Sequence, residues 1–408
     1  MAILAAAFAA YGTDPSWATL QHGMEIIYAA RRLQWPVLAL SIVLCLVVLG
    51  LVVSGKRRAW WLLGLAPVLT LFVHRFTTNP LGAMQVADNP ATVAADRAEF
   101  VHDEDYVVGV NVDGAAYAYP YRQLFLTPVV LQNEYQTRFI VVWSAYANRA
   151  IASRVDRDYR ARDLEIVSMP ANALLVYNTR YGQFINGVTG ATSTGEIPHG
   201  FGKPMVAIKT TWKEWHRANH DSKVMLPTNT EMQRLPAAPL APRYSVGPTT
   251  QPVDMRVVFV PGNQALSLRA EQIAARPLNL NAGTSPVLVF RDPNNGMVRS
   301  FDRRIDVDLF PRFARVDDAK KPAVFMMDVD TNTNWSAGGV AVEGDKSHKG
   351  VRLSPVAVDT DVYFGVMKFW YPSMKLIDVP ADATYKAAPT TVPEAPKAAV
   401  VHRRRRRR

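Results

Sequence analysis

Cysteine is almost absent from this sequence, since Cys45 is the single one among 408 residues. It lies inside an uncharged apolar run, so the rest of the chain contains no thiol. A disulfide, a cysteine-based zinc site and a thiol nucleophile are therefore excluded outside that run. We expect no cofactor and no bound metal.

The chain also carries little excess positive charge outside its two ends. Of the formal net charge of +11, six units come from residues 403–408 and four from residues 1–80, which leaves +1 for residues 81–402. A nearly neutral globular region is a poor surface for nucleic acid. We expect no specific nucleic-acid partner.

Two long apolar segments are present near the N-terminus. Pro36–Val53 is uncharged, and as a helix it would reach through roughly 27 Å of bilayer. Ala59–Phe76 is a weaker candidate because it contains Pro67. We predict a transmembrane helical hairpin over residues 34–76, preceded by an N-terminal tail of residues 1–33. A secretory signal peptide is the alternative, but the first residues lack a basic region.

Flanking charges do not decide the orientation of this hairpin. Three basic residues lie in its loop (56–58), and Arg31, Arg32 and Arg75 lie on the opposite side. The compact basic cluster in the loop slightly favours a cytoplasmic loop. That orientation places the chain after residue 80 outside the cytoplasm.

The chain after the apolar segments is rich in predicted strands. Tyr106–Val112 and Ala115–Tyr119 flank Asp113-Gly114, which is a strong hairpin signal. Phe139–Trp143 is a further apolar strand. Lys209–His220 is the best predicted helix of this region.

A similar pattern starts again after residue 252. Val257–Val260 corresponds to Val107–Val110, and Asn334–Gly339 corresponds to Phe184–Gly190. The order and approximate spacing agree, although few residues are identical. This predicts a diverged internal duplication.

The predicted fold class is therefore an N-terminal transmembrane helical hairpin plus a mainly β (α+β) soluble region built from two diverged tandem repeats. The repeats cover residues 84–226 and 253–380. Residues 227–252 are rich in Pro and Thr and form the predicted linker. Residues 381–408 form a predicted disordered Pro/Ala tail that ends in poly-arginine.

Several short pieces of the first repeat resemble a bacterial family, the domain of unknown function number 3179. The matching pieces are Asp88–Pro90, Asp105–Val110, Ala116–Pro120, Asn172–Tyr177, Val188–Gly190 and Thr211–Trp215, the last of which leads to His220. The resemblance implies an exported or membrane-tethered domain on the extracytoplasmic side of the bacterial cytoplasmic membrane. It implies no settled activity.

In such proteins the strand after residue 138 leads into a Cys-Pro-Leu-Cys-Gly segment, and here Ser144–Asn148 occupies its place. Both cysteines are absent, being replaced by Ser144 and Ala147. Alanine has no ligand atom, and a serine hydroxyl is a poor ligand for soft metals. The segment therefore resembles the remnant of a reactive turn, in which Ser144, Tyr146 and Asn148 remain candidate ligand-binding residues.

His216 and His220 are four residues apart, a spacing that places both on one face of a helix, and Asp221 follows. A metal-dependent or other enzyme would use these residues together with His199. No Glu follows His216, so a solvated helix end is the favoured interpretation.

Other candidates are weaker. Gly187–Gly195 contains Thr189 and could cradle an anion, but no P-loop lysine follows, which favours a flexible connection. Ser144 as a nucleophile lacks the flanking glycines of an elbow motif. Trp335 is a candidate for stacking on a ligand, although a core or interface anchor is favoured.

The candidate polyanion-binding residues are Arg403, Arg404, Arg405, Arg406, Arg407 and Arg408. Mobile guanidinium groups attract anionic lipid head groups and envelope polyanions. The main hypothesis is a membrane-anchored, extracytoplasmic binding or assembly module without catalysis. Its expected partners are the lipid bilayer and an envelope protein or polyanion; an enzyme and a polyanion-binding tail are the alternatives.

Overall fold

The structure is a computed structural model. It describes residues 7–8, 11–55, 80–228, 230–247, 254–262, 264–317, 321, 323–344 and 349–379. The second predicted membrane segment, Ala59–Phe76, and the arginine tail lie outside these residues.

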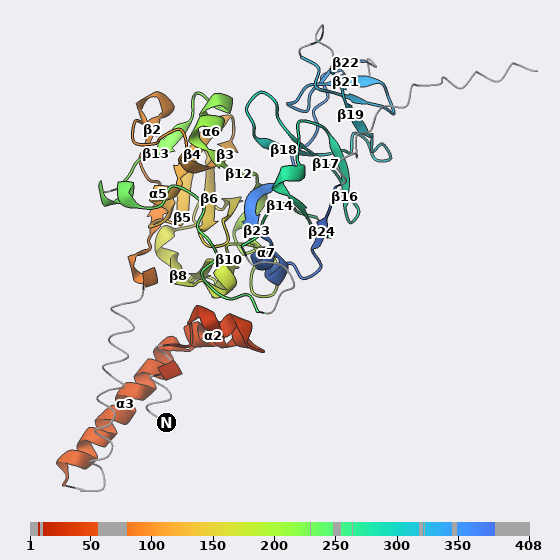
Figure 1. Cartoon of the computed structure of the whole chain (residues 1–408). Coiled ribbons are helices and arrows are strands. Elements are labelled where there is room, and N and C mark those ends of the chain that lie inside the picture. Colours follow the sequence, from red (N-terminus) through yellow and green to blue (C-terminus); the bar gives the residue numbers. More distant parts are fainter. Residues whose placement is uncertain are drawn as a thin grey trace, which may run out of the picture.

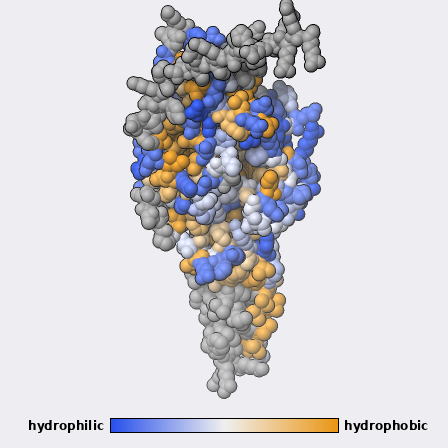
Figure 2. Space-filling model, turned by 90° about the vertical axis from the view of Figure 1, so that its right-hand side faces the viewer, coloured by the Kyte–Doolittle hydropathy of each residue, from blue (hydrophilic) through white to orange (hydrophobic). Residues whose placement is uncertain are grey.

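A short 3-10 helix, η1 (Pro15–Thr19), and the helix α2 (Gly23–Arg32) lie below the main body of the protein (Figure 1). The next helix, α3 (Gln34–Val53), points away from that body, and none of its apolar window is buried against the protein. Its hydrophobic surface therefore projects from the lower end of the molecule (Figure 2). By length and composition α3 is long and apolar enough to cross a membrane, as a membrane anchor or a signal sequence would.

The region from residue 80 onward is mainly β. Its strands are β1 (Val86–Asp88), β2 (Thr92–Ala94), β3 (Tyr106–Val112), β4 (Ala115–Pro120), β5 (Val129–Glu134), β6 (Thr137–Ser144), β7 (Arg149–Val155), β8 (Leu164–Ser168), β9 (Leu175–Asn178), β10 (Gln183–Asn186), β11 (Phe201–Met205), β12 (Ala207–Thr211), β13 (Lys223–Met225), β14 (Arg256–Val260), β15 (Leu266–Arg269), β16 (Leu278–Ala282), β17 (Ser285–Arg291), β18 (Val298–Asp302), β19 (Phe313–Arg315), β20 (Met326–Asp328), β21 (Thr333–Trp335), β22 (Ala341–Glu343), β23 (Asp359–Tyr363) and β24 (Lys375–Ile377). The helices are α5 (Tyr121–Leu124), α6 (Trp212–Ala218) and α7 (Phe364–Trp370), with 3-10 turns η3 (Pro80–Ala83), η4 (Ala95–Arg97), η5 (Ala161–Asp163), η6 (Pro170–Asn172), η7 (Thr230–Arg234) and η8 (Ala270–Gln272).

The described strands of the first half, up to β13, form three sheets. Two have five strands, in the orders β12-β3-β4-β13-β2 and β1-β5-β6-β7-β11, and the third has the order β10-β9-β8. The two larger sheets share a core in which Val110, Tyr119 and Trp143 are buried. The hairpin between β3 and β4 turns at Asp113 and Gly114, both with positive φ, as the sequence predicts.

The described strands of the second half form three smaller sheets, in the orders β23-β14-β15-β24, β16-β17-β18 and β19-β20-β21-β22. In the first of these, β14 is antiparallel to both β23 and β15, whereas β15 is parallel to β24. The strands β12-β3-β4-β13 of the first half have the same order and the same relative directions.

The predicted helix over Lys209–His220 begins later than expected. Lys209–Thr211 continues strand β12, which pairs with β3, and α6 starts only at Trp212. The Thr211 hydroxyl caps this helix by accepting from the Glu214 N–H at 3.4 Å. Sheet pairing therefore overrides the local helical pattern in the first three residues of that prediction.

The two halves and the N-terminal helices contribute to one hydrophobic core. This cluster contains Ile27 of α2, Phe184 and Val188 of the first half, and Phe259 and Val362 of the second half, all fully buried. The halves therefore pack as one body, and the predicted linker also lies on it. Its described part is held to the first half by a 2.8 Å bond from the Arg243 N–H to the Asn172 side chain.

Candidate functional site

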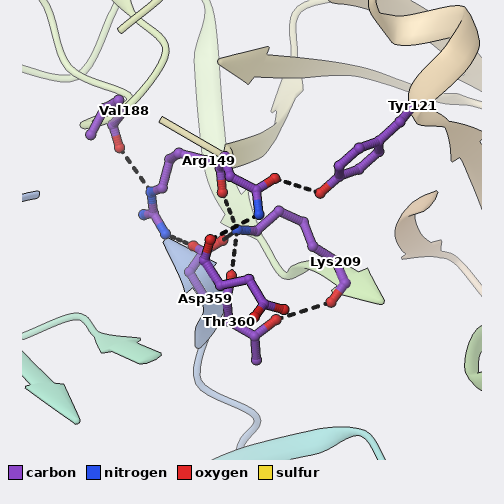
Figure 3. A network of polar contacts seen from close by, with 8 residues as sticks. Tyr121, Arg149, Val188, Lys209, Asp359 and Thr360 are labelled. Carbon is purple, nitrogen blue, oxygen red and sulfur yellow. Dashed lines mark hydrogen bonds and ion pairs between the residues drawn. The ribbon is translucent and has the colours of Figure 1, made fainter. Parts of the chain in front are cut away.

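Three charged side chains meet where the two halves contact each other (Figure 3). Arg149 is the first residue of β7, Lys209 is the middle residue of β12, and Asp359 is the first residue of β23. Their side chains are 9%, 0% and 3% exposed, respectively. Two strands of the first half thus present cations to a carboxylate of the second half.

Each charge in this cluster lies beside an opposite charge, although Asp359 Oδ1 accepts no hydrogen bond of good geometry from a described residue. Arg149 forms an ion pair with Asp359, and its Nε donates to the Val188 carbonyl at 3.0 Å. The Lys209 ammonium lies 3.1 Å from Asp359 Oδ1 and donates to the Thr360 carbonyl at 2.7 Å. Such bonding is what allows charged groups to remain in a low-dielectric interior.

Asn148 extends the cluster from the turn that follows β6. This residue has a positive φ of 45° and is fully buried. Its side chain accepts from the Tyr121 hydroxyl at 2.7 Å and donates to the Asp361 carbonyl at 2.9 Å, while its own carbonyl accepts from Lys209. The turn Ser144–Asn148 is therefore a contact between the halves.

Burial perturbs both cations of the cluster. Burial and the nearby charge of Arg149 lower the pKa of Lys209 well below its ordinary value, whereas Asp361 opposes that shift. Burial also lowers the pKa of Arg149, and the electrostatic effect of the nearby Tyr371 hydroxyl partly opposes this shift. Both cations also lie against the carboxylate of Asp359, which supplies an opposite charge to each.

A cavity of about 450 Å³ lies beside the ion pair of Arg149 and Asp359. One wall comes from β7 and β11, a second from the connection between β10 and β11, and a third from the second half of the chain. The side chains on these walls are largely apolar or small, among them Ile151, Phe201 and Met205. The cavity is thus mainly apolar, with the buried ion pair of Arg149 and Asp359 at one end.

A separate, smaller cleft of about 240 Å³ also lies between the halves. It is lined by Lys209 together with Tyr106, Glu214, Arg291 and Asp361, and is more polar than the cavity. Burial, and then the charge of Asp361, raise the pKa of Tyr106 to about 12. The buried lysine therefore faces this cleft, whereas the buried arginine faces the cavity.

The structure brings some of the sequence-predicted site residues to this junction. Asn148 belongs to the charged cluster, and Thr189 lines the cavity. Ser144 lies next to them but is buried, where its hydroxyl accepts from the Leu174 N–H at 2.9 Å. Tyr146 instead accepts from Arg243 at 3.2 Å, on the segment that joins the halves.

The predicted histidine set is spread over two places. His216 on α6 stacks on Trp212, with ring centroids 5.0 Å apart, and is 5.5 Å from the ring of His220. His220 and Asp221 follow the end of the helix, and both are exposed. His199 instead stacks on Tyr181, which lies in the turn between β9 and β10, with ring centroids 4.1 Å apart. Among the described residues, no three His, Cys, Asp or Glu side chains group as metal ligands.

Trp335 is fully buried on β21 and packs edge-on against Phe313 at 5.8 Å, within the core of the second half. The six arginines of the tail lie beyond the described residues.

Sequence reasoning missed Arg149, Lys209 and Asp359. The available signal was a lysine within a short segment rich in β-branched residues, Ala207–Thr211, and an arginine directly after the turn Ser144–Asn148. A charge inside a buried strand requires a partner, but the sequence does not indicate which residue supplies it.

Comparison with known proteins identifies the family of this mainly β, two-halved chain. Residues 85–373 match the profile of a family described as "Protein of unknown function (DUF3179)", which confirms the expected resemblance. The match covers most of the chain, so the protein belongs to this family. No curated protein and no solved structure matches it.

Proposed function

We propose that this protein is a membrane-anchored binding module, without catalysis, that holds a small ligand in the cavity between its two halves. The observation that carries this proposal is the apolar cavity of about 450 Å³ whose inner end is a buried ion pair. Ligand pockets in proteins commonly have volumes of 300–1,000 Å³ and combine apolar walls with a few polar groups.

The bonding of the polar groups supports binding rather than catalysis. Arg149 is held by Asp359 and by the Val188 carbonyl, so its position is fixed before any ligand arrives. The serine that replaces the first motif cysteine is likewise bonded, to the Leu174 N–H. Polar groups that are held in position beforehand can orient a ligand at little entropic cost, as in preorganised binding sites.

The packing of the N-terminal segment supports membrane anchoring through two crossings. Residues 11–32 pack on the body: Ser168 donates to the Thr13 carbonyl at 2.6 Å, Arg31 pairs with Glu165, and Tyr28 lies 4.7 Å from Phe184. The segment before α3 and the body after residue 80 therefore lie on one side. If α3 crosses the bilayer, the chain must return before residue 80, and Ala59–Phe76 is the apolar segment available for that crossing.

We place the body on the extracytoplasmic side of a bacterial cytoplasmic membrane. The basic residues at 56–58 would then lie in the cytoplasm, in agreement with the positive-inside rule. The proposed partners are accordingly the lipid bilayer and an envelope protein or polyanion, and the arginine tail is a second, independent candidate for binding anionic lipid.

We also infer that the two halves arose by duplication of one unit. Strand β12, helix α6 and strand β13 have five, seven and three residues, and β23, α7 and β24 have the same lengths in the same order. The two four-strand orders described above agree in direction as well. The site at the junction would then combine equivalent edge strands, β12 and β23, of two related units.

Small molecules that co-purify with the full chain test the binding function. The protein would be purified in lipid nanodiscs, extracted with organic solvent and analysed by mass spectrometry. Ile151→Trp fills the cavity from β7, so it should reduce the recovered molecule at least about tenfold. Val307→Trp adds the same side chain at a 78% exposed position outside the cavity and should match the wild type. Equal recovery from all three proteins would refute the proposal.

A further inference from the structure

We infer that the ligand of the cavity is an uncharged, mainly apolar molecule with one hydrogen-bonding end, in the manner of a medium-chain alcohol. The inference rests on the proposed function, because it assigns a chemical class to the ligand of the same cavity. It follows from the balance of charge, from the hydrogen-bonding groups and from the apolar walls.

The charges at the inner end of the cavity neutralise each other. Among the described residues, those that carry charge and line the cavity are Arg149, Asp359 and Glu196. The first two form a buried ion pair. Lys209, which also lies 3.1 Å from Asp359 Oδ1, lines the other cleft, where the carboxylate of Asp361 balances its charge. An anionic ligand would therefore meet the carboxylate of Asp359, and a cationic ligand would meet the guanidinium of Arg149, with no unused counter-charge for either.

The rim of the cavity adds no positive charge. Glu196 lies there, exposed, with its carboxylate accepting from the Thr194 hydroxyl at 3.0 Å. The neighbouring Ile197 is 70% exposed and continues the apolar lining toward solvent. An acidic and an apolar residue together at the mouth disfavour the entry of an anion and favour contact with an apolar molecule.

Hydroxyl groups near the ion pair suit one polar end on the ligand. The Thr189 hydroxyl accepts from the Ala191 N–H at 3.2 Å, which leaves its own proton to donate. The Tyr371 hydroxyl also lines the cavity and donates to the Val188 carbonyl at a long 3.5 Å, a weak bond that a bond to a ligand oxygen can replace. A ligand hydroxyl or ether oxygen at this end would satisfy these donors without a net charge.

The walls between the two ends offer apolar contact. Ile151 projects from β7, Phe201 and Met205 come from β11, and Pro261 and Ala357 come from the second half. Removing a hydrocarbon surface from water gains roughly 25 cal/mol per Å², so these walls favour an apolar chain or ring over a polar molecule of equal size. The ligand would touch both halves of the protein at once.

Three photoreactive probes test this class directly. They share one diazirine-bearing ten-carbon chain and end in a hydroxyl, a carboxylate or a trimethylammonium group. Each probe is irradiated with the full chain in nanodiscs, and labelled peptides are mapped by mass spectrometry. We expect the alcohol to label residues 149–153 and 189–205 at least about tenfold more than either charged probe, because burying one unpaired charge costs more than 1.4 kcal/mol.

The two variants distinguish an error in the proposed ligand class from an error in the proposed binding site. Ile151→Trp should abolish alcohol labelling of these segments and leave labelling of α3 by probe in the bilayer unchanged, while Val307→Trp should behave as the wild type. Stronger labelling by the carboxylate or the ammonium probe, still blocked by Ile151→Trp, would overturn the ligand class and retain the binding function. Labelling of these segments by no probe, or labelling that Ile151→Trp does not alter, would overturn both.

Discussion

At the scale of single residues, the junction depends on Asp359 more than on any other side chain of the cluster. Its carboxylate pairs with both Arg149 and Lys209, and all three groups are almost inaccessible to solvent. A buried ion pair contributes little net stability compared with an apolar replacement, but the loss of one partner leaves the other charge buried and uncompensated.

Asp359→Asn should therefore lower the free energy of unfolding by about 3–5 kcal/mol, because the amide cannot neutralise either cation. Denaturant titration of the full chain, followed by circular dichroism, measures the change. Asp158→Asn removes a carboxylate from the exposed pair with Arg180 and serves as the control, for which little change is expected. A similar small effect for both variants would show that Asp359 does not compensate the buried cations.

At the scale of secondary-structure elements, the packing of α6 on its sheet depends on one glycine. Gly109 lies in the middle of β3, and a Cβ atom built on it would overlap the ring of Trp215. Trp215 is fully buried, and its indole N–H donates to the Ser222 hydroxyl at 2.8 Å, so the ring cannot easily move aside. The helix can approach the strand only because the strand lacks a side chain at this point.

Gly109→Ala should consequently destabilise the protein by about 1–3 kcal/mol, the usual cost of an additional group in a well-packed core. Thermal unfolding would show a lower midpoint, and hydrogen exchange would show faster exchange in α6. Gly82→Ala is the matched control, since a Cβ atom there meets no atom within 4 Å. An unchanged midpoint for Gly109→Ala would mean that α6 is not held close to β3.

Most strands and turns could be predicted from the sequence, whereas the cluster of buried charges could not. Strands such as β3 and β6 are marked by apolar, β-branched runs, and the Asp113-Gly114 turn is local chemistry. The partners of Lys209 lie at positions 148, 359 and 360, and their meeting depends on how the two halves pack. Periodicity carries no information on that packing, so the sequence predicts Asn148 as a candidate ligand-binding residue of a turn but not as a partner of Lys209.

At the scale of the whole molecule, the N-terminal segment links the position of the body to that of the apolar helix α3. Residues 11–32 pack on the first half, and α3 starts two residues after Arg32 with Trp35 67% exposed, as at a membrane interface. A body held this close to the start of an apolar helix would rest on the bilayer surface. Its two halves share one core with α2, so the body and this segment should remain on the same side.

Cysteine labelling tests this arrangement, and the chain is well suited to it because Cys45 is its single cysteine. In a Cys45→Ser background, Leu20→Cys and Tyr135→Cys report on the N-terminal segment and on the body, at positions 53% and 90% exposed. Ser54→Cys reports on the far end of α3. An impermeant maleimide added to intact spheroplasts should label the first two variants, whereas Ser54→Cys should react only after permeabilisation.

The pattern of labelling distinguishes the possible topologies. Labelling of all three variants in intact spheroplasts would show that α3 does not cross the bilayer. Labelling of Leu20→Cys without Tyr135→Cys would place the two packed segments on opposite sides, which is incompatible with the buried contact of Ile27 and with the bond from Ser168 to Thr13. If α3 spans the membrane, the packing of the N-terminal segment on the body requires an even number of crossings between residues 33 and 80. Each single crossing changes the side of the membrane on which the chain lies.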